Sequence, residues 1–138
     1  MAATSFRIKD TVRGCLADRA SREGVTATAL LEQLITEGVE QREYPGIVFR
    51  GPSHDRRAAL AAGPDVWEVV GRLRELDGGD EHRIGILSEE TGLHPRLIRI
   101  AVGYAADHMD DTMRLIRENE AALERTRAAA ERREAILA

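Results

Sequence analysis

The first 43 residues combine a period-2 segment with two stretches of helical periodicity. Over residues 4–9, Phe6 and Ile8 fall on one face, which is typical of a half-buried β-strand. The other face carries Ser5, Arg7 and Lys9. This alternation predicts a short strand at the start of the chain.

Two amphipathic helices are expected to follow this strand. Asp10 and Thr11 are candidate N-caps for the first helix, which should run to near Glu23 and stop at Gly24. Its apolar positions are Val12, Cys15, Leu16 and Ala20. The second helix is expected from caps at Thr26 and Thr28 to about Arg42, with an apolar stripe made by Leu30, Leu31, Leu34, Ile35 and Val39.

A second module is predicted over residues 44–109. The apolar segment 47–49 and residues 57–62 are expected to form a hairpin beside a helix that contains Trp67, which we expect to be a core residue. Two further helices are expected, one over 81–90 and one opened by Pro95 at a favoured first position. Their spacing is that of a helix-turn-helix, in a winged or a plain form.

Residues 110–138 contain no Pro or Gly and predict one long C-terminal helix. Its apolar residues occur in pairs seven positions apart, a stripe too narrow to form a core of its own and suited to lying along a partner. The candidate partner-binding residues are Leu115, Ile116, Leu123, Ile136 and Leu137. A solvated helix and a second dimer contact are the alternatives.

Charge restricts how this chain could bind DNA. The net charge is −4, with −1 in residues 1–43, −3 in residues 44–110 and zero in residues 111–138. DNA-binding proteins usually present a basic face that displaces counterions from phosphates. Any affinity for DNA must therefore come from a few well-placed cations and helix N-termini, and DNA binding that is weak or depends on an effector would follow.

The N-terminal module is predicted to need a second copy. One strand and two short helices cannot bury both apolar stripes, and the strand has unpaired edges. Two copies that pair their strands antiparallel would close the Phe6 face over the helices and leave Arg7 outward, in a ribbon that fits the major groove of double-stranded DNA. Base contacts are expected from Ser5, Arg7 and Lys9, and phosphate contacts from Thr26, Ala27 and Thr28 at the second helix N-terminus.

Two segments of this module resemble a known superfamily. Residues 5–10 (Ser-Phe-Arg-Ile-Lys-Asp) and 24–31 (Gly-Val-Thr-Ala-Thr-Ala-Leu-Leu) look like the ribbon-helix-helix repressors of the Arc, MetJ and CopG superfamily. The resemblance implies a swapped homodimer that binds operator DNA. The family often has small, polar or basic residues at all three outward strand positions, whereas Ala3 here has no side-chain group that could contact DNA.

The second module resembles a helix-turn-helix domain of bacterial antitoxins. The resemblance lies in residues 44–50, 65–70 and 98–105 and covers about residues 44–106. It implies a PIN-like ribonuclease toxin as partner and repression of the protein's own operon. Arg96 and Arg99 are candidates for a second DNA contact, although the negative charge of this module favours packing or protein binding.

Catalysis, metal binding and cofactor binding are not expected. The four histidines show no i, i+3 or i+4 pairing, and no Cys-x-x-Cys occurs. His108 with its neighbouring aspartates is expected to be a helix-junction group rather than an acid/base cluster, and Cys15 a small buried apolar residue. Because no apolar run approaches the roughly 20 residues of a membrane span and no signal peptide is apparent, a cytoplasmic protein without membrane contact is expected.

The sequence thus predicts a mainly α-helical transcriptional regulator of three parts, 1–43, 44–109 and 110–138. Our interpretation is a homodimeric antitoxin that represses its own operon, with higher oligomers on DNA as an option. The alternative is a stand-alone ribbon-helix-helix transcription factor whose C-terminal part drives oligomerisation.

Overall fold

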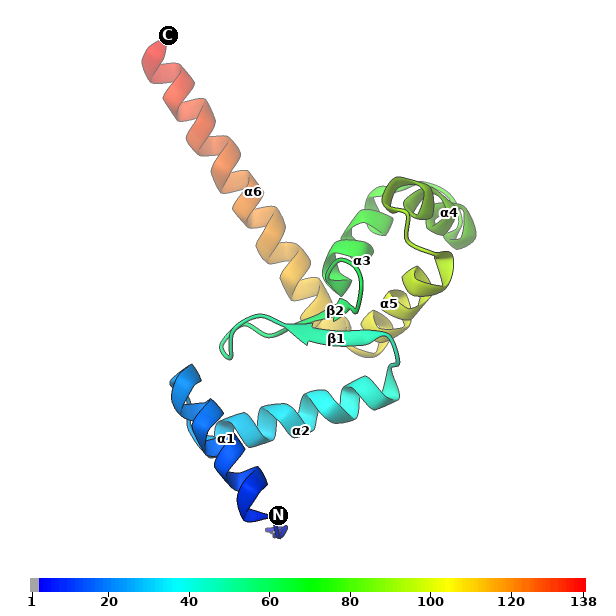
Figure 1. The fold of residues 1–138 in the computed structure, drawn as a ribbon. Coiled ribbons are helices and arrows are strands. Elements are labelled where there is room, and N and C mark those ends of the chain that lie inside the picture. The colour runs from blue at the N-terminus through cyan, green and yellow to red at the C-terminus, as the bar shows by residue number, and fades with distance from the viewer. Residues whose placement is uncertain (1–2) are drawn as a thin grey trace.

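The computed structural model describes residues 3–138 and is mainly helical, with one small antiparallel sheet and a long C-terminal helix (Figure 1). The elements are α1 (Asp10–Glu23), α2 (Ala27–Glu43), β1 (Ile47–Arg50), β2 (Arg57–Leu60), α3 (Val66–Glu75), α4 (Asp80–Thr91), α5 (Pro95–Asp107) and α6 (Met109–Leu137). Their order is the one expected from the hydrophobic pattern.

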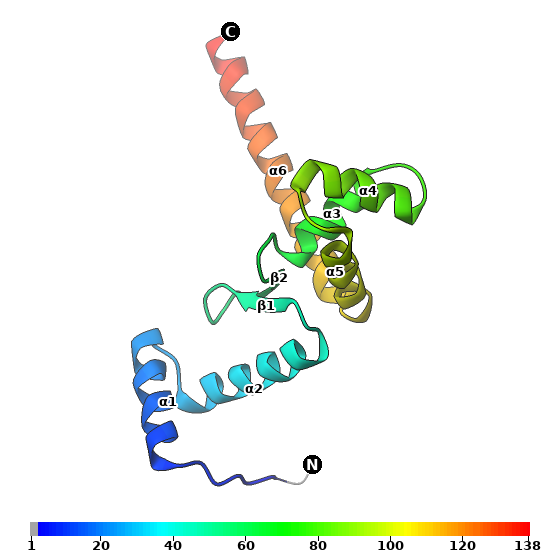
Figure 2. The same ribbon diagram turned by 45° about the vertical axis from the view of Figure 1, so that its right-hand side comes forward.

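The N-terminal segment is extended but is not paired as a strand. Residues 3–9 form no regular secondary structure and lead into α1 from a separate extended stretch (Figure 2). A strand requires a partner for its hydrogen bonds, and the single chain offers none here. That residues 4–9 form a strand therefore stays a prediction, which requires a second chain to pair with.

Local signals set the ends of α1 and α2. Gly24 has φ of 69° and ends α1, while the Val25 amide donates to the Ala20 carbonyl oxygen at 3.0 Å, as in a Schellman motif. The N-cap of α1 is Lys9, without a side-chain bond, so the expected caps at Asp10 and Thr11 are wrong: both residues are already helical. The expected cap at Thr26 is confirmed, since its hydroxyl accepts from the Ala29 amide at 3.1 Å.

The hairpin pairs Ile47 with Leu60 and Arg50 with Arg57. β1 extends one residue beyond the apolar segment 47–49 to Arg50, whose guanidinium donates to the Leu60 and Gly63 carbonyl oxygens at 2.7 and 2.8 Å. Gly51 opens the connection with φ of 102°, and a Cβ there would overlap the Asp55 carbonyl oxygen. The connection between the strands therefore depends on glycine.

One hydrophobic core joins the hairpin to α3, α4 and α5. Its best-buried members are Ile47, Leu60, Val66, Val69 and Ile98. Gly92, with φ of 74°, ends α4, and only residues 92–94 separate it from α5, so two helices joined by a short turn pack on α3. Trp67, expected in the core, is half-buried and donates through Nε1 to the Asp65 carboxylate at 3.2 Å.

The first third of α6 packs against α3, and the rest projects away from the body of the molecule (Figure 1). Thr112 and Ile116 are buried, whereas residues 117–127 and 131–138 are exposed. We call residues 117–138 the α6 arm. The 29-residue helix is therefore part core element and part free arm.

Candidate nucleic-acid interface

The extended segment presents its polar side chains freely. Ser5, Arg7 and Lys9 are all exposed. Within residues 3–138, Arg7 and Lys9 form no ion pair, although many arginines elsewhere in the chain do. Their positive charges are available to an external anion.

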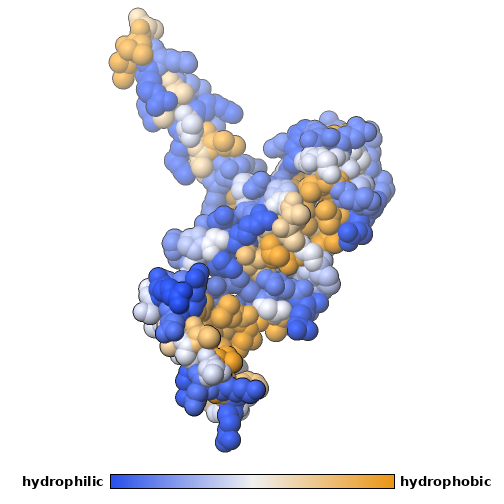
Figure 3. Space-filling view, viewed as in Figure 1, coloured by the Kyte–Doolittle hydropathy of each residue, from blue (hydrophilic) through white to orange (hydrophobic). Residues whose placement is uncertain are grey.

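The apolar side of the same segment is also uncovered. Phe6 is 81% exposed, and Ile8 is half-buried. On α1 and α2, further large apolar side chains are more than half exposed, namely Val12, Leu34, Ile35 and Val39. Figure 3 shows apolar side chains gathered over this part of the molecule.

Few residues of α1 and α2 are buried in the single chain. Of the residues of α1 and α2, only Ala20 and Leu30 are buried. Cys15, expected to be buried, is exposed in the single chain, and it lies on the same helical stripe as Val12 and Leu16. Contiguous apolar patches of this kind usually mark an interaction site. We call the set Phe6, Ile8, Val12, Cys15, Leu34, Ile35 and Val39 the N-terminal apolar face.

The N-terminus of α2 is open to an anion. The Thr26 hydroxyl is occupied by the Ala29 amide, while Ala27 and Thr28 are exposed at the first helical turn. The amides of a first turn have no intrahelical acceptor, and the helix dipole favours a negative group beside them. The residues expected to contact phosphate thus lie together at one helix end.

The two arginines proposed for a second DNA contact differ in their surroundings. Arg96 is exposed on α5 and forms no ion pair within the described chain. Arg99 instead pairs with Glu81 of α4, with 2.6 Å between Nη2 and Oε2. Arg99 would have to release this carboxylate before it could bind a phosphate.

The expected partner-binding stripe on α6 is divided. Leu115 is half-buried and Ile116 is only 6% exposed, because α6 packs against α3 at this level and Ile116 faces Gly71. Ile116 therefore belongs to the protein's own interior, which corrects the expectation for this residue. Leu123, Ile136 and Leu137 are 59%, 83% and 86% exposed on the α6 arm.

A polar joint links α2 to the junction of α5 and α6. The His108 ring stacks on Tyr104, with 4.0 Å between ring centroids, and its Nε2 lies 3.2 Å from Oε1 of Glu40 on α2. The Tyr44 hydroxyl donates to Asp107 at 2.5 Å. Figures 1 and 2 show α2 lying below the hairpin with its C-terminal end toward α5.

The joint shifts the pKa values of its members. The hydrogen bond to Asp107 raises the pKa of Tyr44 to about 12, and burial raises the pKa of Tyr104 to about 12. Burial lowers the pKa of His108, but the hydrogen bonds to the Tyr104 carbonyl and Glu40 and the nearby carboxylates outweigh it, so the net pKa is raised. The charged form of His108 is therefore stabilised beside Glu40.

Sequence spacing could not reveal this joint. Tyr44 and Asp107 are 63 residues apart in the chain, and Glu40 and His108 are 68 residues apart.

A buried carboxylate holds the hairpin to α3. Asp65, 7% exposed, accepts from Arg57 Nε at 2.8 Å and from Trp67, and Arg50 Nη1 lies 3.9 Å away. Because the side-chain partners of Asp65 are arginines and an indole N–H, this cluster stabilises the contact between the hairpin and α3.

Among residues 3–138, no three His, Cys, Asp or Glu side chains gather in an arrangement that could hold a metal ion. No helix of the described chain is long and apolar enough to span a bilayer. The chain matches no protein-family model, no curated protein and no solved structure.

Proposed function

We propose that this chain is a sequence-specific DNA-binding transcriptional regulator that acts as a homodimer through a ribbon-helix-helix module. The observation that carries the proposal is the extended segment 3–9, whose exposed faces differ sharply. Phe6 offers an apolar face to a second copy, while Arg7 and its polar neighbours remain free of ion pairs. Paired antiparallel with its twin, such a segment forms a two-stranded ribbon of the width that enters a major groove.

Arg7 is the base-reading residue in this proposal. Its planar guanidinium can bind guanine O6 and N7 together, while Ser5 and Lys9 have a more tolerant hydrogen-bonding geometry. The open N-terminus of α2 at Ala27 and Thr28 would hold a backbone phosphate and fix the register of the ribbon. The role is one of binding, not catalysis.

The test compares the wild type with Arg7→Ala in a mobility-shift titration on the DNA upstream of the protein's own gene, at two salt concentrations. Loss of a bidentate base contact should weaken binding by about 1–3 kcal/mol, which is about 5-fold to 150-fold. Arg19→Ala is the matched control, because Arg19 lies on α1 and is already paired with Glu23 at 2.8 Å. Equal affinities for Arg7→Ala and the wild type would overturn the ribbon assignment.

We further propose that the regulator is the antitoxin of a toxin–antitoxin pair, with a PIN-like ribonuclease as the toxin. Support comes from the α6 arm, which projects away from the body of the molecule and exposes Leu123, Ile136 and Leu137 (Figure 1). The arm suits a helix that lies along a protein partner.

Co-expression with the product of the adjacent gene tests the antitoxin role. A chain ending at Glu120 should keep its DNA affinity and lose the complex with that product. If the arm serves self-association instead, as in a stand-alone regulator, the shortened chain would change its oligomeric state. In that case even the full-length chain would form no complex with the product of the adjacent gene.

A further inference from the structure

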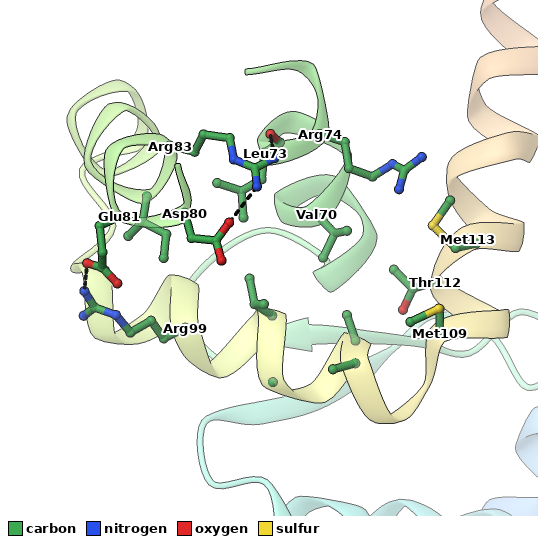
Figure 4. A pocket seen from close by; sticks show the side chains of 15 residues that line it. Val70, Leu73, Arg74, Asp80, Glu81, Arg83, Arg99, Met109, Thr112 and Met113 are labelled. Carbon is green, nitrogen blue, oxygen red and sulfur yellow. Dashed lines mark hydrogen bonds and ion pairs between the residues drawn. The ribbon is translucent and has the colours of Figure 1, made fainter. Parts of the chain in front are cut away.

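A groove lies between α3, α4, α5 and α6, on the side of the body away from the N-terminal module. It encloses about 540 Å³, within the range of roughly 300–1,000 Å³ common for small-molecule sites. Its lining is mainly apolar and includes Val70, Leu73, Ile84, Val102, Met109 and Met113. Figure 4 shows Val70 pointing into the space between α3 and α5, with Met109 and Met113 closing it from α6.

Large apolar side chains are left uncovered at this groove. Met109 is 61% exposed and Val102 is 38% exposed, although the core beside them is well packed. Methionine side chains are flexible and adapt to ligands of irregular shape. The groove therefore offers an adaptable apolar surface that the chain itself does not fill.

Charged residues around the groove are distributed unevenly. At the α4 end, Arg83 pairs with Asp80 at 2.7 Å and Arg99 pairs with Glu81 at 2.6 Å, so both cations are neutralised. At the opposite end Arg74 extends from α3 toward α6 beside Met113 (Figure 4). Within residues 3–138 Arg74 forms no ion pair or side-chain hydrogen bond, unlike its neighbour Arg72, which binds Glu75 and Glu90.

Uncharged polar groups at the Arg74 end are already in use. The Thr112 hydroxyl donates to the His108 carbonyl oxygen at 3.1 Å. An occupant would thus meet one unpaired guanidinium at one end and a mainly apolar surface along the rest. This pattern is complementary to a molecule with one anionic head and an apolar body.

We propose that this groove is a binding site for a small amphipathic carboxylate, whose head group pairs with Arg74 and whose apolar body lies over Val70, Val102 and Met109. The site is formed by residues of α3, α4, α5 and α6 and includes no residue of the extended segment or of α2. Met109 directly follows His108, which contacts Glu40 on α2, so a ligand here would lie next to the joint between the groove and the DNA-binding module.

Calorimetric titration of the full chain with decanoate, below its micelle concentration, tests the proposal. Decylammonium is the charge-reversed probe with a body of the same length. We expect saturable binding of decanoate and at least fivefold weaker binding of decylammonium. Arg74→Gln should weaken decanoate binding about tenfold, because the charged hydrogen bond is lost, and should strengthen rather than weaken decylammonium binding, because the repulsion between two cations is lost as well.

Two further variants make the result specific to the groove. Arg117→Gln, an exposed arginine on α6 outside the groove, should bind decanoate like the wild type. Ala106→Trp, at an exposed groove position, should abolish binding while the circular dichroism spectrum and the melting temperature stay those of the wild type. The proposal is overturned by absence of saturable binding, by equal affinity for the two probes, or by an Ala106→Trp variant that binds normally. It is also overturned if Ala106→Trp turns a larger assembly into a smaller one, since a second copy would then be the occupant.

Discussion

At the scale of single residues, the hairpin depends on the buried Asp65 carboxylate. It neutralises Arg57 and orients the Trp67 indole. Removing it leaves a part-buried guanidinium with a weaker set of acceptors, and hydrogen bonds to charged groups contribute about 1.5–3 kcal/mol each.

Asp65→Ala should therefore lower the free energy of unfolding by about 2 kcal/mol or more, measured by urea denaturation. Asp55→Ala is the matched control. Asp55 also pairs with Arg57, at 2.7 Å, but its side chain is 52% exposed, so its loss should cost less than about 1 kcal/mol. Equal effects of the two substitutions would mean that Asp65 is no more than a surface partner of Arg57.

His108 gives the joint a defined pH dependence. Its pKa is raised in the folded chain, so its charged form stabilises the fold fully below about 6.5, the ordinary histidine pKa, and this contribution is lost as pH rises through the folded-state value. The Oε2 atom of Glu40 is buried without a hydrogen-bond partner, so the Glu40 carboxylate depends more strongly on the positive charge of His108.

His108→Gln should consequently destabilise the chain more at pH 5.5 than at pH 8.5, as measured by urea midpoints. His54→Gln, which removes an exposed histidine from the hairpin connection, serves as the control. A destabilisation by His108→Gln that is constant or grows with pH would contradict the assigned role.

At the scale of elements, α6 has two halves with different tasks. Residues up to Ile116 complete the surface of α3, and most of the α6 arm beyond them is exposed, with Asn119, Glu120 and Leu123 lining a hollow beside α3. Burial of an isoleucine side chain of this kind contributes about 2–5 kcal/mol.

Shortening α6 at two places separates these tasks. A chain ending at Glu120 should unfold at the same urea concentration as the full chain. A chain ending at Asp110 should lose about 3 kcal/mol or more, because Thr112 and Ile116 are removed from α3. Equal stability of both shortened chains would show that α6 contributes nothing to the core.

The helix boundaries were largely predictable because their signals are local. Gly24, Gly92 and Pro95 each mark an end through their own backbone preferences, and the structure places them there. The exact N-cap residue of α1 could not be predicted. The N-cap is Lys9, and no side chain caps the first turn of the helix.

Contacts between distant segments were not predictable. The seven-residue repeat of α6 does not distinguish Ile116, which is buried against α3, from Leu123, which is 59% exposed. Similarly, Arg56 joins the hairpin to Glu37 of α2 with 2.5 Å between Nη2 and Oε1, and no periodicity marks either residue. One chain by itself also cannot display the pairing of residues 4–9, because the partner strand belongs to another copy.

At the scale of the whole molecule, two parts with exposed apolar side chains extend from a well-packed body. One is the N-terminal apolar face, and the other is the α6 arm (Figure 3). We propose that a second copy of the chain covers the N-terminal apolar face and that a different protein binds the α6 arm. The apolar face needs its cover for stability, whereas an isolated alanine-rich helix end can remain in solvent.

Sedimentation equilibrium tests the central claim, that the N-terminal apolar face pairs two chains. The wild type should sediment at twice the chain mass of 15.2 kDa at micromolar concentration. Phe6→Asp should sediment as a monomer, and since Phe6 is 81% exposed in the single chain, the substitution does not disturb that chain's own packing. Leu123→Asp, at an apolar position of the α6 arm that is 59% exposed, should remain a dimer. A wild-type mass of one chain, or a dimer that persists in Phe6→Asp and dissociates in Leu123→Asp, would contradict the account.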